Sequence, residues 1–271
     1  YPYYTLQQLM NKYSLQNRIT GKRVESPQHV YMRIAMQAYL NYEKEGRIEH
    51  IKNLYDLISQ RKVSPATPYY VNSLTWNQNV ASCALIMADD TAESIGVMNA
   101  LGYSLTTAGA GLGATMRIRS FNDQVQGGRI NHTGKVPYYR AFAHTIKSST
   151  QSGRSGAATM QFNFFDPEIE VLLGLKNPLS PDALKLREMD YSLAVNKWFL
   201  QKVAKKENVW LFSYKDAPHL FEALYTDTPE EFEAKMNEFV NSNPLKVKEI
   251  PAMDIMKLYL KNVLETGRVY L

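Results

Sequence analysis

From residue 80 to its end, the sequence alternates between short apolar segments of strand length and longer segments with a helical pattern. Parallel strands need long crossover connections, which helices supply, and strands that are apolar on both faces need cover on both sides. The alternation therefore predicts an α/β protein with a parallel sheet covered by helices. The expected strands are 80–88, 111–116, 157–162, 191–195 and 209–212; the expected helices are 91–108, 136–149, 167–175 and 197–206, with two more before 268–271.

The N-terminal part of the chain has a different pattern. Residues 5–60 look helical, with Ser26 and Pro27 as a start signal and a further helix at 48–58. Pro65 and Pro68 interrupt the helical pattern, which predicts an extended or turning segment at 64–72. We therefore expect a helical region at 1–62 and an α/β region at 63–271.

Composition excludes several classes of protein. The 271 residues contain one cysteine and no apolar stretch near the roughly 20 residues that span a bilayer, and the N-terminus lacks a signal-peptide pattern. These features predict a cytoplasmic protein without a membrane partner. The net charge of +5 is spread along the chain, which favours phosphate-bearing small molecules over a nucleic acid. The five histidines have no metal-ligand spacing, so we expect no metal site in this chain.

The single thiol, Cys83, has two interpretations. It is either an inert residue of a buried strand or half of a chemical device whose redox partner lies on another molecule. Asp89 and Asp90 directly follow the same strand, where a helix cap is the first explanation and an acid pair the second.

Three glycine-containing segments also have competing interpretations. The segment 109–113 lacks the dinucleotide-binding spacing and precedes a strand instead of a helix, so the sequence does not predict a Rossmann loop there. The segments 126–129 and 151–159 each place an arginine among glycines. Each alone is most simply a surface turn, whereas three around one parallel sheet favour a nucleotide site at the strand ends.

Taken together, these motifs resemble the large, catalytic subunit of class I ribonucleotide reductase. The resemblance extends over residues 4–271, and the order and spacing of its motifs carry it. They are Thr67-Pro68, Ser82-Cys83, Asp90-Thr91, Arg117-Ile118-Arg119, His132-Thr133-Gly134, Lys147-Ser148, Gly156-Ala157-Ala158-Thr159, Met189-Asp190-Tyr191, Asn196-Lys197 and Thr266-Gly267-Arg268.

The resemblance implies a helical region followed by the first half of a ten-stranded α/β barrel, a five-stranded parallel half-barrel that another chain completes. In the family, the cysteine matching Cys83 reduces the ribose of a ribonucleoside diphosphate and ends in a disulfide with a second cysteine. The resemblance gives Thr67, Ser82 and Gly111 to the substrate site, together with Cys83.

The resemblance also implies an allosteric specificity site at a large-subunit dimer interface, which binds a deoxynucleoside triphosphate or ATP with Mg²⁺. Asp90, Thr91 and Arg119 match residues that hold this effector, and Gln126 stands where some members have a second arginine. In the family, one loop relays effector identity to substrate choice. The matching loop here contains Gln151 and Arg154 and is one residue shorter than in some relatives.

Several family features do not occur in this sequence. The Asn-x-Cys-x-Glu strand of the radical cysteine, the C-terminal tyrosine pair, the tail cysteines and an ATP-cone domain are not found. We therefore expect the first piece of a split large subunit, as in some bacteriophages related to the T-even group; a truncated or proteolytic fragment is the competing explanation. The expected partners are a complementary C-terminal fragment, a metal-containing small subunit that supplies the radical, and thioredoxin or glutaredoxin acting through the missing tail.

Two functions follow from these expectations. The first is a component of ribonucleoside-diphosphate reductase, inactive without the fragment that carries the thiyl-radical cysteine. The alternative is a non-catalytic fragment that binds deoxynucleotides as a regulator or scaffold.

Overall fold

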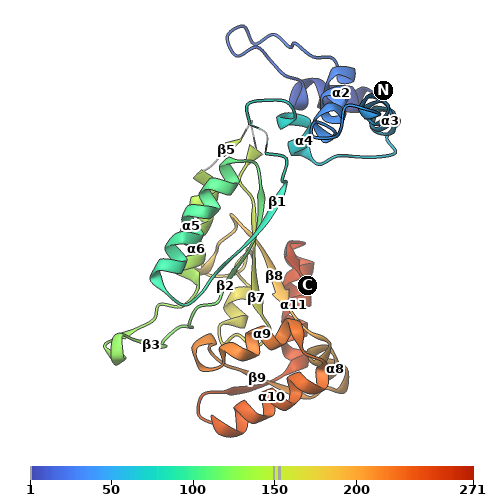
Figure 1. Cartoon of the computed structure of the whole chain (residues 1–271). Coiled ribbons are helices and arrows are strands. Elements are labelled where there is room, and N and C mark those ends of the chain that lie inside the picture. Colours follow the sequence, from blue (N-terminus) through green and yellow to red (C-terminus); the bar gives the residue numbers. More distant parts are fainter. Residues whose placement is uncertain (1, 78, 149, 152–153) are drawn as a thin grey trace. The chain divides into compact units, whose positions relative to one another are not determined.

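The computed structural model describes residues 2–77, 79–148, 150–151 and 154–271, with the backbone alone at 150, 151 and 154. The chain divides into two compact units, each considered separately below (Figure 1). The N-terminal unit comprises Tyr1–Cys83, Ala108–Ala110 and Gln151–Arg154. The sheet unit comprises Ala84–Thr107, Gly111–Thr150 and Ser155–Leu271.

Short helices build the N-terminal unit. Ser26 and the His29 side chain form a capping box at the start of one helix, and Pro27 occupies its first turn, where no backbone donor is needed. The helices bury one apolar cluster made of Leu9, Val30, Tyr31, Ile34 and Ile58. The elements are α1 (Tyr3–Gln8), the π-helical turn η1 (Leu9–Tyr13), α2 (Pro27–Ala38), α3 (Arg47–Ser59) and α4 (Thr67–Asn72).

The expected extended segment at 64–72 is wrong in its second half, because α4 begins at Thr67. Pro68 lies in the first turn of this helix, a position that tolerates proline, so it starts a helix instead of preventing one. A buried arginine ties α4 to α2: Arg33 donates hydrogen bonds to the carbonyl oxygens of Ser73 (2.6 Å) and Tyr70 (2.7 Å) and pairs with Glu25 at 2.8 Å.

A five-stranded sheet in the order β1-β2-β7-β8-β11 organises the sheet unit. The pairings of β2 with β7, β7 with β8 and β8 with β11 are parallel, which confirms the half-barrel expectation. Helices α5 and α6 run side by side along the sheet (Figure 1). The strands are β1 (Cys83–Ala88), β2 (Gly111–Met116), β7 (Ala158–Asn163), β8 (Asp190–Ala194) and β11 (Val269–Tyr270); the connecting helices are α5 (Ala92–Thr107), α6 (Val136–Ser148), α7 (Ile169–Leu173), α8 (Lys197–Lys205) and α11 (Ala252–Thr266).

The two faces of this sheet differ in burial. One face is buried and contains Leu112, Ala114, Met160, Phe162, Tyr191 and Leu193. The other is the open face; it carries exposed side chains on β1 and half-buried, mostly small or polar side chains on the next three strands. The members of the open face are Cys83, Leu85, Met87, Gly111, Gly113, Thr115, Thr159, Gln161, Asp190 and Ser192.

The exposed side chains of the open face agree with the half-barrel expectation, because half a barrel leaves one face of its sheet without cover. Along β1, Leu85 is 89% exposed and Met87 is 50% exposed. The Leu85 side chain lies over Gly113, where an added Cβ would come within 2.5 Å of its Cδ2, so both residues lie on the open face. Only β1 has apolar side chains throughout that face; the other strands alternate between core and polar positions.

The C-terminal third also differs from expectation. The strand expected at 209–212 is β9 (Asn208–Leu211), but it pairs antiparallel with β10 (Lys248–Pro251) outside the main sheet. Three helices, not two, follow β9, because the helical pattern is interrupted by β10. They are α9 (Pro218–Thr226), α10 (Pro229–Ser242) and α11; the short elements elsewhere are β3 (Gln124–Val125), η2 (Gln126–Gly128), β4 (Ile130–Asn131), β5 (Thr150–Gln151), β6 (Arg154–Ser155), η3 (Asp182–Leu184) and η4 (Tyr214–Asp216).

A glycine at the crossing of α5, α6 and β7 gives a test of this packing. In Gly156→Ala the new Cβ would lie 2.3 Å from the Ile146 carbonyl oxygen and 2.4 Å from Thr106 Cγ2. We expect a loss of about 2–3 kcal/mol in the free energy of unfolding, measured by urea denaturation. Gly96→Ala, in exposed helix α5 with open space around it, should instead gain about 0.5–1 kcal/mol. Equal stability of the two variants would contradict this packing.

Candidate functional site

Cys83 lies at the start of β1 and its thiol is exposed. The hydroxyl of Ser82 points to it, with 3.7 Å between Ser82 Oγ and Cys83 Sγ. Cys83 is therefore not a core residue of the described part of the chain, and its role in redox chemistry stays a prediction. Its exposure follows from the alternation along β1, which directs the odd-numbered side chains of this strand away from the helices. An accessible thiol beside a hydroxyl can react with a molecule that approaches the open face.

The other two predicted substrate residues lie on different elements. Thr67 is the first residue of α4, and its Oγ1 lies 3.5 Å from the hydroxyl of Tyr13. Gly111 is the first residue of β2 and is half-buried. Gly111 belongs to the sheet unit, whereas Thr67, Ser82 and Cys83 belong to the N-terminal unit.

Asp90 and Arg119, both predicted effector residues, form an ion pair in which two guanidinium nitrogens approach one carboxylate oxygen. Arg119 donates from Nε to Asp90 Oδ2 at 2.7 Å, and its Nη2 lies 2.6 Å from the same oxygen. The Arg119 backbone N–H donates to Asp90 Oδ1 at 3.1 Å, and Nη1 donates to the Gln124 carbonyl oxygen at 3.1 Å. The hydrogen bond to Asp90 raises the pKa of the Arg119 guanidinium, which stays cationic and partly exposed.

The start of α5 lies beside this pair. Thr91 caps the helix, since its Oγ1 accepts from the Ser94 backbone N–H at 3.1 Å. Asp90 is therefore not the cap, and its carboxylate is committed to Arg119 instead. A helix N-terminus together with a guanidinium suits an anionic group such as phosphate.

The remaining predicted effector residues are not part of this pair. Gln126 is exposed at the start of η2 and has a positive φ of 51°, so it belongs to a tight turn. The backbones of Gln151 and Arg154 lie in β5 and β6, which pair as a two-stranded sheet. Their side chains lie outside what the structure describes, and their predicted roles stay predictions.

His132 is a residue near the pair to which no individual role was given from the sequence. It is buried and stacks on Tyr138, with 5.1 Å between ring centroids. Burial lowers the pKa of its imidazole, and the charges of Asp90 and Arg119 also act on it. Its Nδ1 accepts from the Gly134 N–H at 3.2 Å, which in the neutral ring leaves the proton on Nε2.

A buried ionic cluster, made of Lys135, Asp166, Glu168 and Ser120, anchors the loop that carries Arg119. Lys135 Nζ lies 2.9 Å from Asp166 Oδ2 and 3.7 Å from Glu168 Oε2, and donates to Ser120 Oγ at 3.0 Å. The side chains of Lys135 and Asp166 are each 2% exposed. Burial raises the pKa of the Glu168 carboxyl, and the charge of Lys135 opposes this shift. Charges this deeply buried are tolerated because they are paired and hydrogen-bonded.

Asp123 provides a second anchor for the same loop. Its carboxylate accepts from the Ser120 backbone N–H at 2.6 Å and from the Ser213 hydroxyl, and it pairs with Lys215 at 3.1 Å. Burial alone would raise the pKa of this carboxyl, but these hydrogen bonds and the Lys215 charge bring it below its ordinary value. Lys135 thus binds the side chain of Ser120 and Asp123 binds its backbone, and together they fix the residue that follows Arg119.

The described residues also lack two further kinds of feature. Within the described residues, no group of three or more histidine, cysteine, aspartate or glutamate side chains could hold a metal ion. No helix in the described part of the chain is long and apolar enough to cross a membrane.

Two family models match the chain, one for each of its two kinds of structure. Residues 81–271 match the family model described as "Ribonucleotide reductase, barrel domain", and residues 1–78 match "Ribonucleotide reductase, all-alpha domain". The chain therefore belongs to the ribonucleotide reductase large-subunit family.

Similar proteins include subunits from bacteria, a bacteriophage and a parasite. The chain is 33% identical over 273 residues to "Ribonucleoside-diphosphate reductase 1 subunit alpha" of Escherichia coli, covering 100% of this chain and 36% of the relative. It is 30% identical over 268 residues to the alpha subunit of Enterobacteria phage T4, covering 97% and 35%. The large subunit of Plasmodium falciparum is 29% identical over 276 residues, covering 100% and 33%. The chain thus spans about a third of the length of these relatives.

The ionic cluster can be tested by removing its only cation. Lys135→Met leaves Asp166 and Glu168 buried without a counter-charge, so we expect the free energy of unfolding at pH 7 to fall by about 3–5 kcal/mol in urea denaturation. Lys257→Met, at a pair with both side chains largely exposed, should change it by less than about 0.5 kcal/mol.

The same variant has an expected pH dependence. When folding raises the pKa of a carboxyl, the folded state binds the proton more tightly than the unfolded state does. The protonated carboxyl therefore favours folding at low pH, and this contribution to the free energy of unfolding is lost as pH rises through the folded-state pKa. The deficit of Lys135→Met should therefore shrink as pH falls toward about 4, the ordinary range of glutamate. A deficit that is constant from pH 7 to pH 4 would contradict uncompensated charge as its cause.

Proposed function

We propose that this chain is part of the catalytic subunit of a ribonucleoside-diphosphate reductase. The observation that carries the proposal is the exposed Cys83 thiol beside Ser82 at the start of a strand of the family's barrel domain. Thr67 and Ser82 hydroxyls and the Gly111 backbone would bind the diphosphate and ribose, since hydroxyl and amide groups donate to phosphate oxygens.

The proposed reaction needs a second thiol. The substrate loses its 2′-hydroxyl as water and gains hydrogen at that carbon, while two thiols lose two hydrogens and form a disulfide. Cys83 is the only cysteine of the sequence, so the second thiol and the radical cysteine would come from a complementary part of the large subunit. The radical would come from a metal-containing small subunit, and thioredoxin or glutaredoxin would restore the thiols.

The Asp90–Arg119 pair is proposed as the centre of an allosteric site for a deoxynucleoside triphosphate or ATP with Mg²⁺. Arg119 and the N-terminus of α5, capped by Thr91, would hold phosphate oxygens, and Asp90 can accept a hydrogen bond from a ribose hydroxyl. Gln126 would contribute a neutral contact, and the loop with Gln151 and Arg154 would relay effector identity to the substrate.

The assembly and origin are also proposals. The open face of the sheet would be covered by the remaining half of the barrel, and large subunits would form a homodimer in the cytoplasm. Similarity to the alpha subunit of phage T4 is compatible with a split bacteriophage enzyme. The non-catalytic alternative, a deoxynucleotide-binding regulator or scaffold, requires the same effector site and no turnover.

Nucleotide binding tests the effector site without requiring the rest of the enzyme. We expect Arg119→Gln to raise the Kd of the chain for a deoxynucleoside triphosphate about 10- to 100-fold, because a charge-assisted contact with phosphate is lost. Isothermal titration calorimetry with dTTP, dGTP and dATP measures this change. Arg129→Gln, on the same loop and exposed, is the matched control and should bind as the parent chain does. Equal affinity of the two variants would remove Arg119 from the site.

Turnover separates the catalytic proposal from the regulatory alternative. The chain is mixed with its complementary large-subunit part and small subunit, and conversion of ribonucleoside to deoxyribonucleoside diphosphate is measured with excess thioredoxin. We expect Cys83→Ser to assemble normally and to lose at least about 1,000-fold in multiple-turnover rate, since a hydroxyl does not form the disulfide. Full turnover by this variant would exclude Cys83 as reductant; no turnover by the parent mixture, with dNTP binding retained, would favour the regulator.

A further inference from the structure

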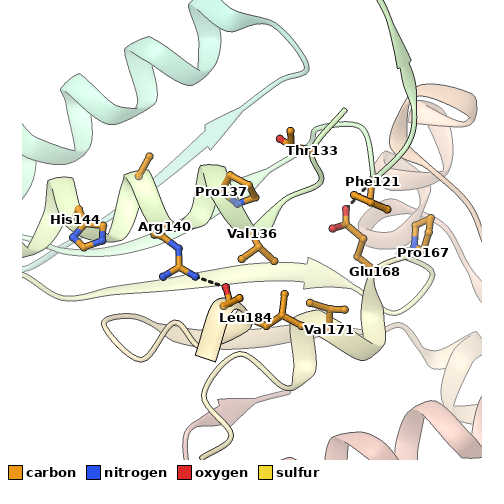
Figure 2. A pocket seen from close by; sticks show the side chains of 12 residues that line it. Phe121, Thr133, Val136, Pro137, Arg140, His144, Pro167, Glu168, Val171 and Leu184 are labelled. Atoms are coloured by element: carbon orange, nitrogen blue, oxygen red, sulfur yellow. Dashed lines mark hydrogen bonds between the residues drawn. The ribbon is translucent and has the colours of Figure 1, made fainter. Parts of the chain in front are cut away.

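A further cavity of the sheet unit, the outer cavity, is lined by neither Asp90 nor Arg119. Its volume is about 830 Å³, within the range of small-molecule sites. Most of its lining is apolar, and α6, α7, η3 and the loop before α6 supply it (Figure 2). The apolar lining residues on which the argument depends are Phe121, Val136, Pro137, Val171 and Leu184.

Hydrogen bonds between the elements that form the cavity hold its walls in place. Glu168 accepts from the backbone N–H groups of Phe121 (3.1 Å) and Lys135 (3.1 Å), which joins the loop and α6 to the start of α7. On the opposite side, Arg140 donates from Nη2 to the Ala183 carbonyl oxygen at 2.7 Å, which joins α6 to η3. A cavity formed in this way needs little ordering when a ligand enters.

The charges of the cavity are separated. Figure 2 shows Arg140 and His144 at one end and Glu168 at the other. Glu168 already has its partners, because it accepts two backbone N–H groups and lies 3.7 Å from Lys135 Nζ. Arg140 is different: it donates a hydrogen bond to a neutral carbonyl oxygen, its charge also acts on the buried Tyr191 hydroxyl, and no carboxylate of the described residues forms an ion pair with it. His144, one helical turn further along the same face of α6, is exposed.

We propose that this cavity binds a small amphipathic anion, with an aromatic or other apolar body between α6 and α7 and a carboxylate or sulfonate at Arg140 and His144. The apolar lining supplies the burial, and the unpaired guanidinium supplies the preference for negative charge. The site is separate from the proposed reductase chemistry, so it stands or fails independently of Cys83 and Arg119.

Two fluorescent probes of the same shape test the site: 8-anilinonaphthalene-1-sulfonate, which carries a sulfonate, and N-phenyl-1-naphthylamine, which does not. In titrations of the full chain, Arg140→Gln should raise the Kd of the sulfonate probe about 10-fold and leave that of the neutral probe within about 2-fold. Ala141→Trp, which fills the cavity from an exposed position of α6, should weaken both probes. Circular dichroism confirms that each variant is folded.

The open face of the sheet is the competing location for such probes, because Leu85 and Met87 are exposed there. The double variant Leu85→Gln/Met87→Gln is the matched control and should leave the Arg140-dependent part of sulfonate binding unchanged. The proposal is overturned if this control abolishes that binding, or if neither Arg140→Gln nor Ala141→Trp changes it. Equal loss of both probes in Arg140→Gln would likewise overturn the preference for an anion.

Discussion

The whole α/β part of the chain depends on one constraint: one face of its parallel sheet is buried, whereas the other is exposed along β1. On the buried face, side chains such as Met160 and Tyr191 are fully buried; α5 packs on β2, and α6 and α7 pack on β7. On the open face, β1 exposes Leu85 and Met87, and β2 has only Gly113 beneath Leu85. Burial of exposed apolar side chains favours association, so the same asymmetry that leaves Cys83 accessible also gives a physical reason for another polypeptide to cover this face.

The loop between β2 and α6 connects the Asp90–Arg119 pair, the buried ionic cluster and the outer cavity. Arg119, Ser120 and Phe121 are consecutive, yet they contact Asp90, the Lys135 cluster and the outer cavity respectively. Lys135, paired with Asp166, binds the Ser120 hydroxyl, and Asp123 accepts the Ser120 backbone N–H; both contacts limit where the neighbouring Arg119 guanidinium can lie. A paired buried charge is costly to break, which suits a position where a side chain must keep its direction.

The sequence alone predicted the strand and helix order well, because hydrophobic period and length distinguish the two in β2, β7 and β8. It did not predict that α4 begins at Thr67, since proline in a first helical turn and proline in an extended segment have the same local signal. Nor did it predict the antiparallel pairing of β9 with β10, which depends on tertiary contacts. Asp90 and Arg119 were assigned to one site only by family resemblance, because a pair separated by 29 positions has no local signature. The outer cavity arises from four separate segments and was not predicted.

The most direct test of the central claim, that Cys83 is a reductant on the open face, is the state of its sulfur after one turnover. The assembled enzyme is allowed to react with ribonucleoside diphosphate in the absence of thioredoxin and other reductants, quenched with an alkylating reagent and digested. Mass spectrometry then determines whether the peptide containing Cys83 is alkylated or disulfide-linked. The account predicts a disulfide to a cysteine of the complementary part, in proportion to the deoxynucleotide formed. Product formation with Cys83 remaining a free, alkylated thiol would contradict it.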